Sequence, residues 1–133
     1  MSYPFVSESN GFRIEITTDF DFDQSNPMQF QYLFRYNITI KNIGHKNAQL
    51  LSRKWNIKDA KGSVKFVEGP GVIGQTPHFT PGDVFEYSSF CPLPTMSGDM
   101  WGHFNMQGKD GETFKIDTPV FHFEIPKDFI DDY

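Results

Sequence analysis

Apolar and polar residues alternate along much of the chain, most regularly between Tyr32 and Lys41. Every second residue from Tyr32 to Ile40 is aromatic or β-branched, and most residues between them are polar or charged. A period of two predicts a β-strand with one buried face, because successive side chains of a strand point to opposite sides. A helix would instead need apolar residues three and four positions apart.

The same alternation predicts six more strands. They cover residues 12–17, 48–58, 63–67, 83–90, 100–107 and 113–125, the last interrupted near Pro119. Polar turns at 59–62 and 109–111, each ending in glycine, join neighbouring strands as hairpins, and 19–26 and 68–82 are predicted loops. No segment has a helical period. About seven short antiparallel strands predict an all-β sandwich or barrel, with Trp55 as a core anchor.

Length and aromatic content are typical of a single domain with one core. The chain has 133 residues, including 15 Phe, and 17% of it is aromatic. A chain of this size usually buries about two thirds of the surface that its unfolded form exposes. Neither a repeat nor a shift in composition marks a second unit. We therefore predict one domain over residues 1–133, with its core from about 12 to 125 and an acidic, frayed end at 127–133.

Net charge and the lack of sorting signals limit the kinds of partner and the cellular compartment that we expect for this protein. The formal net charge of −5 repels phosphate backbones and anionic lipid surfaces, so neither nucleic acid nor a membrane is an expected partner. No stretch reaches the roughly 18 apolar residues that span a bilayer, and the first residues lack the pattern of a signal peptide. The single cysteine, Cys91, excludes an internal disulfide. Together these features predict a cytoplasmic protein.

Gly69, Gly71 and Gly74 follow the Gly-x-Gly-x-x-Gly spacing of dinucleotide-binding loops. In those folds a helix begins directly after the loop, but prolines in the following segment prevent one here and exclude a Rossmann unit. Two interpretations stay open. Either the backbone amides bind a phosphate or nucleotide weakly, or the glycines only provide the positive φ angles of a compact turn. The second is favoured, because the acidic residues Glu68 and Asp83 flank the loop.

Cys91 lacks the surroundings of a catalytic nucleophile. A reactive cysteine needs a helix N-terminus or a nearby histidine to stabilise its thiolate. Pro92 and Pro94 prevent a helix from starting at the thiol. We therefore predict that Cys91 is a buried and unreactive side chain.

The metal-ligating residue types also lack the spacing of a known site. Four histidines are spread along the chain: His45, His78, His103 and His122. His103 and His122 could meet across neighbouring strands, but two ligands leave a metal site incomplete. Asp19, Asp21 and Asp23 resemble the start of a calcium loop without its central glycine and closing glutamate, and we interpret them as part of a solvated loop. The sequence therefore predicts no metal, no cofactor and no catalytic residue.

A set of motifs, taken together and in order, resembles the ApaG domain. The motifs are Gln24–Pro27, Arg53–Ile57, Gly69–Pro77, Cys91–Leu93 and Met96–Gly102. The resemblance extends from about Phe12 to Ile125, and this combination is far more specific than the glycine loop alone. One departure is Phe90, because the family often has a glycine directly before its Cys-Pro-Leu motif.

The resemblance implies a fibronectin type III or immunoglobulin-like β-sandwich, and it implies no catalytic residue. Related domains are appended to eukaryotic F-box and polymerase-interacting proteins, which implies protein binding, whereas bacterial members are associated with cobalt resistance and magnesium efflux. We therefore predict a non-catalytic module that binds another protein. The alternative is a small-molecule regulator that binds a nucleotide or pyrophosphate through the Gly69–Gly74 loop. The oligomeric state stays open, because the sequence does not show which strands lie at a sheet edge.

Overall fold

The computed structural model describes residues 3–130 of the chain. Its elements are β1 (Phe5–Ser9), β2 (Phe12–Asn26), the short 3-10 turn η1 (Pro27–Gln29), β3 (Gln31–Asn42), β4 (Ala48–Asp59), β5 (Val64–Pro70), β6 (His78–Phe79), β7 (Val84–Leu93), β8 (Ser97–Gly108), β9 (Thr113–Asp117), β10 (Phe121–Glu124) and the single helical turn α1 (Lys127–Ile130). The predicted all-β fold class is confirmed.

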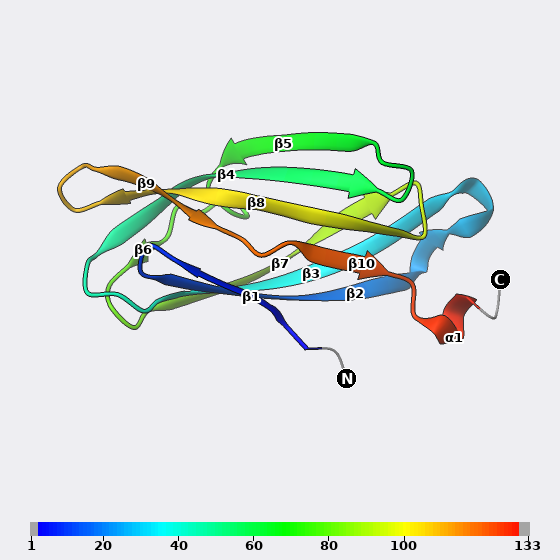
Figure 1. The fold of residues 1–133 in the computed structure, drawn as a ribbon, viewed down its shortest axis with the longest axis horizontal. Helices are drawn as coiled ribbons and strands as arrows, with labels where there is room; N and C mark the ends of the chain where they lie inside the picture. The colour runs from blue at the N-terminus through cyan, green and yellow to red at the C-terminus, as the bar shows by residue number, and fades with distance from the viewer. Residues whose placement is uncertain (1–2, 131–133) are drawn as a thin grey trace.

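The strands form two antiparallel sheets that face each other (Figure 1). One sheet has the order β1-β2-β3-β7, and the other has the order β10-β8-β4-β5. In the second sheet β5 and β6 both pair with β4, while β9 and β10 both pair with β8. This arrangement is the predicted fibronectin type III-like sandwich.

Side chains from the inner faces of both sheets form one aromatic core. Trp55 is only 2% exposed and lies edge-on to Phe104 and Phe121, with ring centroids 5.6 and 5.7 Å away. Tyr36 of the opposite sheet approaches the same indole to 6.0 Å. Edge-to-face packing sets the positive edge of one ring against the negative face of another and adds to the gain from burial. The prediction that Trp55 anchors the core is confirmed.

Several boundaries differ from the predicted ones. The segment 19–26 is predicted to be a loop, but β2 extends through Asn26, because it pairs with β3 through Asp21 and, after an irregular stretch, again at Asn26. Residues 3–130 form ten strands rather than about seven. The segment 113–125 divides at Pro119 into β9 and β10, and the short strands β1 and β6 were not predicted.

The C-terminal segment also differs from its prediction. Residues 127–133 are expected to be frayed and without a helix, whereas the structure shows one helical turn, α1, directly after β10 (Figure 1). The rest of the predicted frayed end, residues 131–133, lies outside the described residues. Within the described part of the chain, no helix is long and apolar enough to cross a membrane.

Candidate functional site

The glycine loop that the sequence singles out begins at the end of β5 and folds as a tight turn. Gly71 and Gly74 have φ angles of 59° and 77°, which confirms the predicted positive φ. The amide of Gly71 donates to the carbonyl oxygen of Leu51 at 2.7 Å, and Val72 and Gln75 exchange two backbone hydrogen bonds of 2.8 and 2.9 Å. Because these amides already have acceptors within the protein, they do not form a nest of free N–H groups.

Arg53 of β4 holds this loop from the neighbouring strand. Its Nη1 donates to the carbonyl oxygens of Pro70 at 3.0 Å and Gly71 at 2.8 Å. Gly69 stands directly opposite Arg53 in the pairing of β4 with β5, and a Cβ at Gly69 would lie 3.1 Å from both terminal nitrogens. Glycine at position 69 therefore leaves room for the guanidinium group, a role that the glycine spacing alone does not reveal.

A polar cleft of about 490 Å³ lies next to the loop. Its lining includes Lys54 of β4, Glu68 and Gly69 of β5, His103 and Asn105 of β8, and Lys115 of β9. Lys54, His103 and Asn105 alternate with buried core residues of the same strands, so their side chains point to the outer face of the sheet. Of the three glycines predicted as a ligand loop, Gly69 is the one that lines this cleft.

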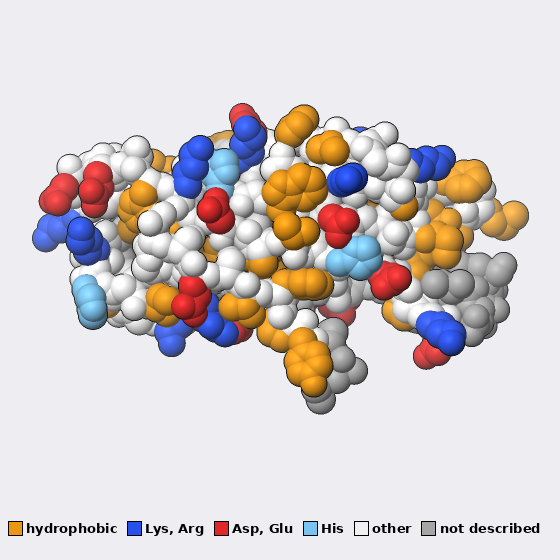
Figure 2. All heavy atoms as spheres, viewed as in Figure 1, with side chains coloured by type: hydrophobic (Ala, Val, Ile, Leu, Met, Phe, Trp, Pro, Cys, Tyr) orange, Lys and Arg blue, Asp and Glu red, His pale blue; other side chains and the backbone are white. Residues whose placement is uncertain are grey.

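Strand register brings the charged residues of the cleft together. Lys54 stands opposite His103, and Lys115 stands opposite Asn105, two residues from His103. Figure 2 shows cationic side chains and a histidine gathered over β4, β8 and β9, at the upper left of the view, with acidic side chains beside them. Partial burial lowers the pKa of His103, and the positive charges of Lys115 and Lys54 lower it further, against the opposing effects of Asp117 and Glu68. At neutral pH His103 is therefore mainly uncharged.

Cys91 lies in β7 and is 1% exposed. Burial raises the pKa of its thiol to about 12. The thiol is therefore protonated at neutral pH and is a poor nucleophile, since thiolate is the reactive form. The prediction of a buried side chain is confirmed.

The two histidines that could have met across strands do not. His122 of β10 stands opposite Asp99 of β8, with 2.8 Å between its Nδ1 and Oδ1 of the carboxylate. His103 lies further along β8, opposite Lys54 and Asp117. Over residues 3–130 there is no group of three or more His, Cys, Asp or Glu residues placed to hold a metal ion.

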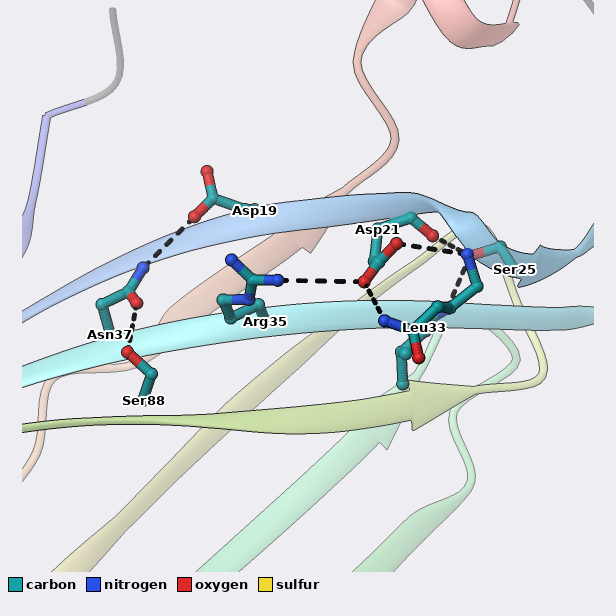
Figure 3. A network of polar contacts seen from close by, with 8 residues as sticks. Asp19, Asp21, Ser25, Leu33, Arg35, Asn37 and Ser88 are labelled. Atoms are coloured by element: carbon teal, nitrogen blue, oxygen red, sulfur yellow. Dashed lines mark hydrogen bonds and ion pairs between the residues drawn. The ribbon is translucent and has the colours of Figure 1, made fainter.

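The aspartates that resemble the start of a calcium loop lie on β2 and contact the neighbouring strand (Figure 3). Asp19 accepts a hydrogen bond of 3.2 Å from the side-chain amide of Asn37, and Asp21 lies 3.9 Å from the guanidinium group of Arg35. Arg35 also stacks over the ring of Phe90, at 5.3 Å from its centroid. The predicted loop is therefore wrong, because all three aspartates lie on β2 and two of them, Asp19 and Asp21, pair with β3. Asp19 and Asp23 are exposed to solvent, as predicted.

Comparison with known proteins places this fold and its motifs in a family. Residues 22–108 match the family model of the ApaG domain. The chain belongs to the ApaG family. A protein named ApaG from Brucella anthropi is 44% identical over 119 residues, which cover 90% of this chain and 92% of that protein. ApaG from Mesorhizobium japonicum is 48% identical over 104 residues, 78% of this chain and 80% of the relative.

Solved structures agree with this ApaG assignment. The crystal structure of a Bordetella pertussis protein named ApaA superposes with a TM-score of 0.85 at 36% identity, and covers 95% of this chain and 99% of that one. The resemblance found in the motifs is thus confirmed. The names of these relatives state no reaction, ligand or partner.

An exposed apolar strand, β5, forms one edge of the second sheet of this ApaG domain. Among the described strands β5 pairs only with β4, and the pairing runs without a bulge from Val64 to Pro70. Val64, Phe66 and Val67 are 41%, 69% and 40% exposed. Natural edge strands usually avoid such flat apolar surfaces, because a free row of backbone N–H and C=O groups pairs readily with another chain. β5 is therefore a candidate interface.

Proposed function

We propose that this ApaG-family protein is a non-catalytic binding module that pairs an extended segment of another protein with β5. The observation that carries this proposal is the exposed edge of β5 with Phe66, which is 69% exposed. An extended peptide adds to a free sheet edge through main-chain hydrogen bonds, while its alternate side chains contact the neighbouring face. The partner segment would therefore be extended and apolar at every second position.

The sheet face next to β5 supports such an interface. Phe66 stands opposite Asn56 of β4, and Asn56 stands opposite Trp101 of β8. The outer face therefore carries two aromatic side chains, the exposed Phe66 on the edge strand and the partly buried Trp101 two strands away, with Asn56 between them. Aromatic side chains often contribute most of the binding energy of an interface.

The alternative is a regulator that binds a nucleotide or pyrophosphate through Gly69, Gly71 and Gly74. It is less well supported, because the amides of Gly71 and its neighbours donate to carbonyl groups of the protein itself. This alternative stays a prediction, as do the cytoplasmic location and the associations with cobalt resistance and magnesium efflux.

Site-specific photo-crosslinking in cells tests the proposed interface. A photoreactive phenylalanine analogue is placed at Phe66 in one variant and at Val120 in a matched control. Val120 is 60% exposed and lies just before β10, on the other side of β8 from β4. We expect a discrete adduct with one protein from position 66 and none from position 120.

A binding measurement with the crosslinked partner completes the test. Phe66→Lys places a charge on the edge strand and should weaken binding of the purified partner at least about tenfold, because loss of a side chain that dominates an interface costs about 2 kcal/mol or more. Val120→Lys should leave the affinity unchanged. Equal adducts from both positions, or a partner that binds Phe66→Lys as tightly as the wild type, would refute the proposal.

A further inference from the structure

We propose that the cleft on the outer face of β4, β8 and β9 binds the phosphoryl group of a small ligand between Lys54, His103 and Lys115. This site differs from the glycine loop, where the amides of Gly71, Val72 and Gln75 are already bonded, and from the edge of β5. It does not depend on the proposed protein partner.

Two ammonium groups meet beside His103 on the outer face of the sheet. Lys54 and Lys115 line the cleft from β4 and β9, with the carboxylate of Glu68 also in the lining and Asp117 opposite His103 in the strand pairing. The side chain of Arg53 points to the other face, because Arg53 precedes Lys54 on β4 and pairs with the buried Phe104. Lys54 lies 3.6 Å from Glu68, but both side chains are largely exposed, at 42% and 68%. Exposed ion pairs of this kind contribute little, so Lys54 can turn to a stronger anion. Among the described residues, neither Arg53 nor Lys115 has a carboxylate within ion-pair distance.

The kind of cation favours a phosphoryl group over a carboxylate. Planar carboxylates are recognised best by the two-pronged guanidinium of arginine, but Nη1 of Arg53 is directed at the carbonyls of Pro70 and Gly71. The remaining cations are the ammonium groups of Lys54 and Lys115, which reach the cleft from β4 and β9. Two separate ammonium groups are well placed to bind a phosphate dianion, because its oxygens accept hydrogen bonds from several directions.

The side chains that line the cleft are held in place by the sheet. Its residues stand on paired strands, and the side-chain amide of Asn105 donates to the hydroxyl of Ser52 at 2.8 Å. Side chains on paired strands are better fixed than side chains on loops, so less ordering is needed when a ligand binds.

His103 makes this proposal measurable. The charges of Lys54 and Lys115 disfavour its protonated form. A bound dianion offsets those charges, so the pKa of His103 must rise when phosphate occupies the cleft. His122 provides an internal control, since it stands beside Asp99 and does not line the cleft.

The experiment is an NMR titration of the histidine side chains with pH at constant ionic strength. It is run without ligand, and then with inorganic phosphate, pyrophosphate or succinate. We expect phosphate and pyrophosphate to raise the pKa of His103 by at least about 0.5 units in a saturable way. His122 should stay unchanged, and succinate should have a much smaller effect. An equal shift of both histidines, or an equal response to succinate, would overturn the proposal.

Variants then locate the anion. Lys54→Gln and Lys115→Gln should each raise the apparent Kd for phosphate at least about fivefold, since each removes a charge-assisted hydrogen bond. Lys109→Gln, in the exposed turn between β8 and β9, is the matched control and should have no effect. Gly71→Ala should also leave the phosphate response intact. If Gly71→Ala abolishes the response while Lys54→Gln and Lys115→Gln do not, the anion binds at the glycine loop and the cleft is not the site.

Discussion

Replacing Gly71 and Gly74 separately by alanine tests whether the glycine loop is a structural turn. Both residues have positive φ angles, 59° and 77°, in the region where an L-residue costs roughly 1–2 kcal/mol. The two positions differ in the space around them. A Cβ on Gly71 would collide with the carbonyl oxygen of Gln75, whereas a Cβ on Gly74 would meet no atom within 4 Å.

The expected costs follow from these differences. Alanine also reduces the entropy of the unfolded chain, which offsets roughly 0.4–1 kcal/mol of the backbone strain. Gly74→Ala should therefore lower the free energy of unfolding by about 1 kcal/mol. Gly71→Ala must in addition displace Gln75 and weaken its hydrogen bond to the amide of Val72, which brings the cost to about 3 kcal/mol.

Urea unfolding followed by tryptophan fluorescence measures both costs. With an m-value of about 2 kcal/mol/M, the midpoint should fall by about 0.5 M for Gly74→Ala and about 1.5 M for Gly71→Ala. Isothermal titration of the wild type with pyrophosphate, compared with both variants, tests the alternative. If both variants unfold like the wild type while a measurable pyrophosphate affinity is lost, the loop is a binding site and the structural reasoning fails.

Two further predictions concern single side chains. Cys91 should not react with a thiol reagent in the folded protein, because the thiol is buried and burial raises its pKa to about 12. It should react as the chain unfolds in urea. Rapid labelling without denaturant would contradict this prediction. Asp83 accepts hydrogen bonds from the amide and hydroxyl of Thr80 at 2.8 and 2.7 Å, and they lower its pKa below the ordinary 3.8. This stabilisation is complete above the unfolded pKa and is lost as pH falls through the lower folded pKa. Asp83→Asn should therefore lower the urea midpoint at pH 6 but less so below about pH 4; an undiminished difference in acid would exclude the charge as its source.

The pairing of strands in the folded protein decided the extent of elements that the local residue pattern left ambiguous. The segment 19–26 is predicted to be a loop because most of its residues are polar. β2 nevertheless continues there, since β3 pairs with residues 19–21 and again with Asn26. The opposite case is Tyr32 to Lys41, where regular alternation predicts β3 almost to the residue. Alternation of apolar and polar residues shows which face of a strand is buried. It gives no signal where both faces of the strand contact solvent or polar neighbours.

The sequence by itself determined the fold class, the positions of the long strands, the burial of Trp55 and Cys91, the positive φ angles of Gly71 and Gly74, and, through its motifs, the ApaG family. Those features follow from local residue order, because side-chain period and glycine placement act within a few residues. Only the tertiary structure decided the candidate sites. Arg53 reaches the glycine loop across a hairpin. Lys54 meets His103 and Lys115 because β4 pairs with β8, which lies far along the chain and forms a hairpin with β9. The exposed edge of β5 likewise depends on which strands lack a neighbour, and local residue order does not encode that.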